Sequence, residues 1–103
     1  MLDVLGLSAR AGALVSGTGA VRAAAREAKV HHVVLAADAA EGQRRKLIPL
    51  LDARRIPYSI GFTRAELGAA TGRPPVSAVG IDNPKLAGRA RELLAGLEDR
   101  RPQ

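Results

Sequence analysis

The stretch HHVVLAAD, residues 31–38, is the feature that most constrains the fold of this chain. Its centre is a continuous run of β-branched and aliphatic residues, which is typical of a strand that is covered on both faces. Segments with helical periodicity alternate with short apolar runs along the rest of the sequence. We therefore expect an α/β fold, a three-layer α/β/α sandwich with a small mixed sheet.

The expected elements follow from periodicity and from turn residues. We expect an opening helix from Leu2 to near Gly12 and further helices over 18–29, 38–55, 63–72 and 83–97, with strands over 13–15, 31–38, 56–60 and 76–81. A chain of 103 residues has room for one domain. We place that domain at residues 1–98 and expect residues 99–103 to be a frayed tail.

Helix boundaries are predicted from capping residues. Thr18 is the expected N-cap of the second helix, and Asp82 or Asn83 is expected to cap the last one, ahead of Pro84. Asp38–Glu41 and Thr63–Glu66 both match the capping-box pattern. Pro49 lies inside the third helix, where we expect it to remove one backbone hydrogen bond and kink the helix.

Helical spacing also predicts which side chains face the core. The inward positions are expected to be Leu2, Leu5 and Ala9 in the first helix, Val21, Ala24, Ala25 and Ala28 in the second, Leu47, Leu50 and Leu51 in the third, and Leu86, Ala90, Leu93, Leu94 and Leu97 in the last. With one Phe, one Tyr and no Trp, the core must be packed mainly from Ala, Val, Leu and Ile. Helices packed through such small side chains lie close to their neighbours.

The formal net charge is +6, from 16 Lys and Arg against 10 Asp and Glu, and this excess favours a polyanionic partner. Arg22, Arg26 and Lys29 fall on the face of the second helix opposite its apolar stripe. Arg44, Arg45 and Lys46 cluster in the third helix, as a second phosphate-binding patch or as a solvated helix face. RNA is the leading candidate partner, and a basic surface that only promotes solubility is the alternative.

Several function classes are disfavoured by the composition. The absence of Cys excludes disulfides and thiolate chemistry. No apolar run reaches the roughly 20 residues of a membrane span, so we expect a cytoplasmic protein with no membrane partner. Adjacent strand residues point to opposite faces, so His31 and His32 cannot easily share a metal. With no visible pair of nucleophile and base, we expect no enzyme, no cofactor and no metal.

The stretch SGTGAVRAAAR, residues 16–26, begins with Gly-x-Gly and continues as a helix. A dinucleotide-binding turn would follow a full strand and would carry a third Gly, but Arg22 stands at that position and the preceding strand is very short. The stretch still suits the binding of an anion, because a helix N-terminus presents free N–H groups and a partial positive charge. Such an end can hold an RNA phosphate or a base edge.

Six segments together resemble the ribosomal L7Ae/L30e superfamily of kink-turn RNA-binding proteins, especially its small bacterial YlxQ-like branch. They are LGLSARAGALVSG (5–17), HHVVLAADA (31–39), KLIPLL (46–51), IPYSI (56–60), ELGAATG (66–72) and VSAVGI (76–81). The resemblance implies the α/β/α fold and an RNA site formed by the entry to the second helix, the residues after the first long strand and the loop before the last strand.

Carried onto this chain, the resemblance implies RNA contacts at Gly17, Thr18, Gly19, Ala20, Arg22, Ala23, Ala37, Asp38, Arg73, Pro74, Pro75 and Val76. Arg26 is added as a phosphate contact because it lies on the basic face. Kink-turn readers commonly carry Asn, Glu and Lys where this chain has Gly19, Ala20 and Ala23, and Glu where it has Ala37. Glycine and alanine cannot make the side-chain hydrogen bonds that these residues supply.

The expectation is therefore a non-catalytic RNA-binding protein associated with the ribosome or with translation. Its partners would be structured RNA, ribosomal or kink-turn-like, and ribosomal or translation proteins, with no DNA. One alternative is a protein-interaction adaptor that kept the fold and lost kink-turn specificity. Another is an accessory domain of an RNA-modifying enzyme, although this chain contains nothing that would supply the methyltransferase part.

Overall fold

The computed structural model describes residues 2–99, with side chains described for residues 2–93. Within this range the chain forms the helices α1 (Leu2–Arg10), α2 (Thr18–Arg26), α3 (Glu41–Ala53), α4 (Arg64–Ala70) and α5 (Pro84–Asp99). The strands are β1 (Leu14–Ser16), β2 (His32–Leu35), β3 (Tyr58–Ile60) and β4 (Ala78–Ile81). Each expected element is present, and the three longer strands are shorter than their apolar runs. No helix within the described range is long and apolar enough to cross a membrane.

The sheet is mixed and has the strand order β1-β4-β2-β3. Strand β4 is antiparallel to both of its neighbours, pairing Val15 with Gly80 on one side and Val33 with Gly80 on the other. Strand β2 runs parallel to β3. The two inner strands are buried along their whole length, as the continuous apolar run of β2 indicates.

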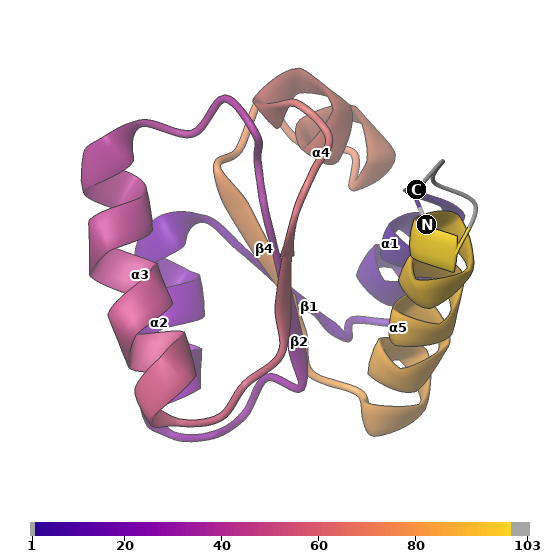
Figure 1. Ribbon diagram of the computed structural model, residues 1–103. Coiled ribbons are helices and arrows are strands. Elements are labelled where there is room, and N and C mark those ends of the chain that lie inside the picture. The colour runs from indigo at the N-terminus through magenta and orange to yellow at the C-terminus, as the bar shows by residue number, and fades with distance from the viewer. Residues whose placement is uncertain (1, 100–103) are drawn as a thin grey trace.

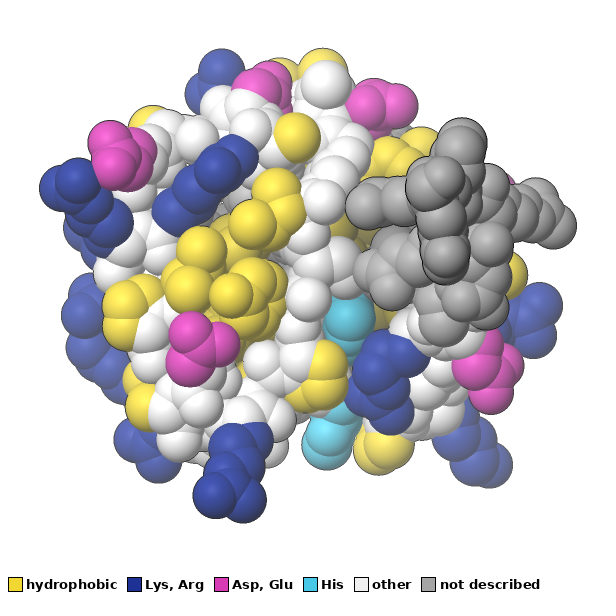
Figure 2. Space-filling model, viewed as in Figure 1, with side chains coloured by type: hydrophobic (Ala, Val, Ile, Leu, Met, Phe, Trp, Pro, Cys, Tyr) yellow, Lys and Arg dark blue, Asp and Glu magenta, His cyan; other side chains and the backbone are white. Residues whose placement is uncertain are grey.

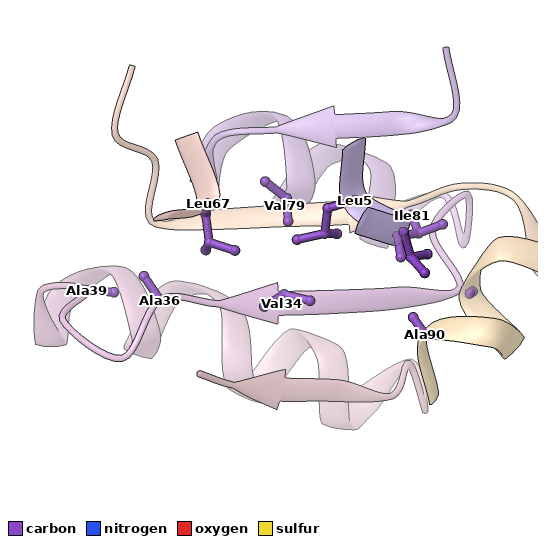
Figure 3. Packing of buried hydrophobic residues seen from close by; sticks show 10 residues of the cluster. Leu5, Val34, Ala36, Ala39, Leu67, Val79, Ile81 and Ala90 are labelled. Atoms are coloured by element: carbon purple, nitrogen blue, oxygen red, sulfur yellow. The ribbon is translucent and has the colours of Figure 1, made fainter. Parts of the chain in front are cut away.

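Helices cover both faces of the sheet (Figure 1), which confirms the three-layer α/β/α sandwich. Alternate strand residues point to opposite faces. Val34, Val79 and Ile81 pack against α1, α4 and α5 in the cluster drawn in Figure 3. Val33, Leu35 and Ala78 pack against Val21 of α2 and Leu47 of α3 on the other face.

Several local predictions are confirmed. The Thr63–Glu66 capping box caps α4 through both of its hydrogen bonds. Asn83 is the residue that caps α5, since its side-chain oxygen accepts from the N–H groups of Lys85 and Leu86. Pro49 lies inside α3. Each of these signals depends on residues that are close in sequence.

The predicted N-cap and the predicted C-terminal end of the second helix are wrong. The N-cap is Gly17, with a φ of 97°, and Thr18 is the first helical residue. The helix ends at Arg26, so Ala28 is exposed, with a left-handed φ of 55°, rather than buried. Glycine adopts such angles at little cost, which explains Gly17 but leaves Ala28 in a conformation that favours glycine.

The predicted capping box at Asp38–Glu41 is also wrong. The N-cap of α3 is Ala40, and no side chain caps it. The side chain of Asp38 is used elsewhere, because its Oδ1 accepts a 2.8 Å hydrogen bond from the backbone N–H of Arg64. A contact between segments so distant in sequence does not follow from a local pattern.

Some predicted core positions are exposed or only partly buried. Leu93 is 39% exposed, so it is not a core residue of α5. Leu50 and Ala9 are half-buried, while Ser8 is fully buried and donates to the Val4 carbonyl oxygen at 2.8 Å. The side chains of Leu94 and Leu97 lie outside the described residues, as do residues 100–103 of the predicted tail, whereas Asp99 ends α5.

Candidate nucleic-acid interface

An open hollow of about 500 Å³ lies where the first turn of α2 meets α3 and the loop that precedes β4. We call it the α2 groove. Its lining residues are Thr18, Gly19, Arg22, Gln43, Lys46, Pro75, Val76 and Ser77. The fold therefore brings the Gly-rich entry and the 73–76 loop, two distant parts of the predicted site, to one place.

Gly17 fixes the position of the α2 N-terminus. Its N–H donates to the Ala78 carbonyl oxygen at 2.9 Å, and its own carbonyl oxygen accepts from the Val21 N–H at 2.9 Å. The helix is thereby held against the start of β4. Among the described residues no side chain caps α2, so N–H groups of its first turn remain available to a ligand. The partial positive charge of this helix end favours an anion there.

The loop before β4 is held against α4. The N–H of Arg73 donates to the Gly68 carbonyl oxygen at 2.8 Å, and the N–H of Val76 donates to the Arg64 carbonyl oxygen at 3.1 Å. A Cβ added at Gly68 would lie 2.6 Å from the carbonyl carbon of Pro74, so only glycine lets the loop approach this closely. Proline at 74 and 75 further limits the conformations of the loop.

Two lining residues, Gln43 and Lys46, were not among the predicted RNA contacts of the family site, although Lys46 belongs to the cluster that was expected to be either a second phosphate patch or a solvated helix face. They are three residues apart on α3 and therefore share one face of the helix. The sequence places Lys46 in a basic cluster but does not show which face of α3 packs beside α2. Lys46 supplies a second cation opposite Arg22, and Gln43 supplies an amide that can both donate and accept hydrogen bonds.

The other basic residues of α2 and α3 do not line the groove. Arg44 donates to the Ala37 carbonyl oxygen, and Arg45 forms a 2.8 Å ion pair with Glu41 on the same helix. Arg26, a predicted phosphate contact, is exposed at the far end of α2. The cluster at 44–46 is thus divided, with only Lys46 facing the groove.

Ala37 and Asp38 lie near the groove without lining it. The N–H of Ala36 donates to the Ser77 carbonyl oxygen at 2.8 Å, which places the start of this segment beside the loop. Ala37 is exposed, and its N–H donates to the Phe62 carbonyl oxygen at 2.8 Å. Asp38 holds the start of α4 through Arg64, so its contacts in the structure are with the protein itself.

This structural role of Asp38 can be tested by its effect on folding stability. We expect Asp38→Ala to lower the free energy of unfolding by about 1 kcal/mol, as for the loss of a helix-capping acceptor. Asp38→Asn keeps the acceptor oxygen and should lose less folding stability, since the exposed ion pair with Arg64 contributes little to that stability. Urea unfolding followed by circular dichroism measures both changes. Equal stability of Asp38→Ala and the natural protein would contradict the role.

Titratable groups do not gather into a metal site in the described part of the chain. His32 is buried, and its Nε2 lies 2.7 Å from the Ser59 hydroxyl oxygen. Burial, with a smaller effect of the nearby Arg91 charge, lowers the pKa of His32 to about 4. The ring is therefore neutral near pH 7 and packs as part of the sheet.

Comparisons with known proteins identify chains with the same fold. A solved structure of a Bacillus halodurans protein of unknown function matches with a TM-score of 0.87 and 29% identity, covering 91% of this chain and 95% of that one. A Giardia lamblia 15.5kD RNA-binding protein has the same fold, with a TM-score of 0.74, 20% identity and coverage of 89% and 85%. No curated protein matches the sequence. The model of one family matches residues 1–90, so this chain belongs to the ribosomal protein L7Ae/L30e/S12e/Gadd45 family.

Proposed function

We propose that this protein binds structured RNA through the α2 groove, without catalysing a reaction. The observation that carries the proposal is that a helix N-terminus without a side-chain cap, Arg22, Lys46 and a loop bound to α4 border one open hollow. Membership of the family and the fold shared with an RNA-binding protein support it. We further propose that the RNA belongs to the ribosome or to another part of the translation machinery.

The groove suits a phosphate backbone more than a specific base sequence. Arg22 and Lys46 supply positive charge to phosphates, and the α2 N–H groups donate hydrogen bonds to the same kind of oxygen. Nothing lies within 4 Å of a Cβ position on Gly19, so a ligand has open space at this turn. Gln43 is the lining side chain best suited to a base edge.

Binding should depend on salt because phosphate contacts release counterions. We expect a plot of log affinity against log salt to have a slope of about −2 to −5 for a structured RNA, corresponding to a few neutralised phosphates. Lys46→Gln should make this slope shallower by about 0.7–0.9, the value of one lost phosphate contact. Fluorescence anisotropy over a range of KCl concentrations measures both quantities.

Arg45→Gln is the matched control, because Arg45 is next to Lys46 on α3 but pairs with Glu41. It removes the same charge outside the groove and should leave the slope nearly unchanged. A slope near zero for the natural protein, or equal effects of the two variants, would overturn the proposal. Recovery of protein partners without RNA after crosslinking in cells would favour a protein-interaction adaptor instead.

A further inference from the structure

A second hollow, of about 310 Å³, lies at the end of the sheet away from the α2 groove. The groove lies beside the start of β4 and the segment that follows β2. The second hollow is lined by segments before β2, before β3 and after β4, including His31, Pro57 and Pro84. Figure 2 shows the two histidines beside basic side chains in this lower part of the molecule. We call it the arginine hollow, because Arg54, Arg55 and Arg91 also line it.

The arginine hollow concentrates positive charge without a balancing acid. Its three arginines come from the end of α3 and from α5, and no described carboxylate lines it. None of the three forms an ion pair with the described residues. The Nη1 of Arg91 donates to the His31 carbonyl oxygen at 3.2 Å, which orients this guanidinium while leaving its other N–H groups to donate elsewhere.

The backbone at Arg55 is in a conformation that favours glycine. Arg55 follows the last turn of α3 with a left-handed φ of 56°, and Ile56 closes the turn by donating to the Leu51 carbonyl oxygen at 2.9 Å. Gly12 and Gly72 occupy the equivalent position after α1 and α4, each with a φ of 70°, and Ala28, which also lines the hollow, occupies it after α2 with a φ of 55°. An arginine at such a position is strained, and strain of this kind is concentrated at functional sites.

We propose that the arginine hollow binds a phosphate group. Guanidinium groups bind phosphate oxygens through paired, charge-assisted hydrogen bonds, and three arginines line this hollow. The phosphate belongs either to an RNA backbone or to a free phosphorylated small molecule. The site is separate from the α2 groove, so it does not depend on the proposed function. If the ligand is RNA, the protein contacts nucleic acid at both ends of its sheet.

The test is a titration of the whole protein with inorganic phosphate, followed by amide NMR spectra at constant ionic strength. We expect saturable shifts at His31, Arg55 and Arg91. Arg91→Gln should weaken phosphate binding about tenfold or more, as expected for the loss of a charge-assisted hydrogen bond. Arg89→Gln is the matched control, since Arg89 is exposed on the same helix and does not line the hollow. It should change the affinity by no more than about twofold, as for a screened surface charge.

A second variant separates binding from folding. Arg55→Gly removes a guanidinium and relieves the left-handed strain, so it should raise the melting temperature while weakening phosphate binding. Shifts of the same amides on addition of a short RNA duplex identify RNA as the source of the phosphate. Shifts with phosphate and pyrophosphate but not with RNA identify a small molecule. The proposal is overturned if phosphate gives no saturable shifts, or if Arg89→Gln weakens binding as much as Arg91→Gln.

Discussion

Gly68→Ala should destabilise the protein and weaken RNA binding together. The added Cβ would lie 2.6 Å from the carbonyl carbon of Pro74 and 2.8 Å from the carbonyl oxygen of Arg73. These are backbone atoms, so the loop itself must move away from α4. Such overpacking costs about 1–3 kcal/mol of folding stability. Because the same loop forms one wall of the α2 groove, we expect RNA affinity to fall about tenfold, the equivalent of 1.4 kcal/mol.

Gly88→Ala is the matched control for this substitution. Gly88 lies inside α5, and the nearest atom to its added Cβ is the Arg91 Nη2 at an ordinary 3.8 Å. Replacing a glycine in a helix interior by alanine should raise stability by about 0.5–1 kcal/mol. Urea unfolding and RNA titration of both variants measure the difference. If Gly68→Ala is as stable as the natural protein and binds RNA with the same affinity, then the close packing of the loop against Gly68 does not support the groove.

Restoring the polar side chains of the family site should create a preference for kink-turn RNA. The triple substitution Gly19→Asn, Ala20→Glu and Ala23→Lys places these side chains on exposed positions of α2, and a Cβ at Gly19 meets no atom within 4 Å. Hydrogen bonds to charged groups contribute about 1.5–3 kcal/mol each, so the gain in preference from the three side chains together should reach about two decades or more. The natural protein, which lacks these groups, should show only a small preference.

The measurement compares the affinity for a standard kink-turn with that for a variant RNA lacking the sheared G·A pairs. Ala65→Glu with Ala69→Lys is a suitable control, since it adds the same two charges to exposed positions of α4, outside the groove. The control should leave the preference unchanged. Strong discrimination by the natural protein would show that backbone groups of α2 are sufficient for kink-turn recognition.

The fold was predictable because its determinants are local and repeated. The apolar run of β2 indicated a strand covered on both faces, and the structure places it between β4 and β3 with helices on each side. The Thr63 capping box and the Asn83 cap involve residues that are within three positions of one another. Each of these two caps forms between residues of the local sequence, so its pattern can be read without knowledge of the rest of the fold.

The same reasoning failed where a distant partner competes for a side chain. Asp38–Glu41 and Thr63–Glu66 have similar patterns, yet only the second forms a capping box. The Asp38 carboxylate binds the Arg64 backbone instead, and this partner is visible only in three dimensions. Thr18 was predicted as the N-cap of α2, but the N-cap is Gly17. Gly17 can adopt a positive φ, and its N–H is bound to the Ala78 carbonyl oxygen, so the helix already includes Thr18.

The candidate site was predictable only in part, for a related reason. Thr18, Gly19, Arg22, Pro75 and Val76 were expected and do line one groove. Gln43 was missed, and the role of Lys46 was left open between a phosphate patch and a solvated face, because both depend on which face of α3 lies beside α2. Periodicity shows that Leu47 and Leu51 point inward, but it does not show which helix is the neighbour on either flank.

The position of β4 has a consequence for when the protein becomes able to bind. This strand pairs with β1 on one side and β2 on the other, and it is the last strand along the chain. Thr18 and Pro75 line one groove only after this strand has inserted, because Gly17 is bound to Ala78 of β4. During synthesis, a nascent chain whose β4 is still inside the ribosome would therefore lack the assembled α2 groove and the RNA affinity that depends on it. Binding assays on stalled chains of increasing length would show affinity appearing in one step, when β4 emerges.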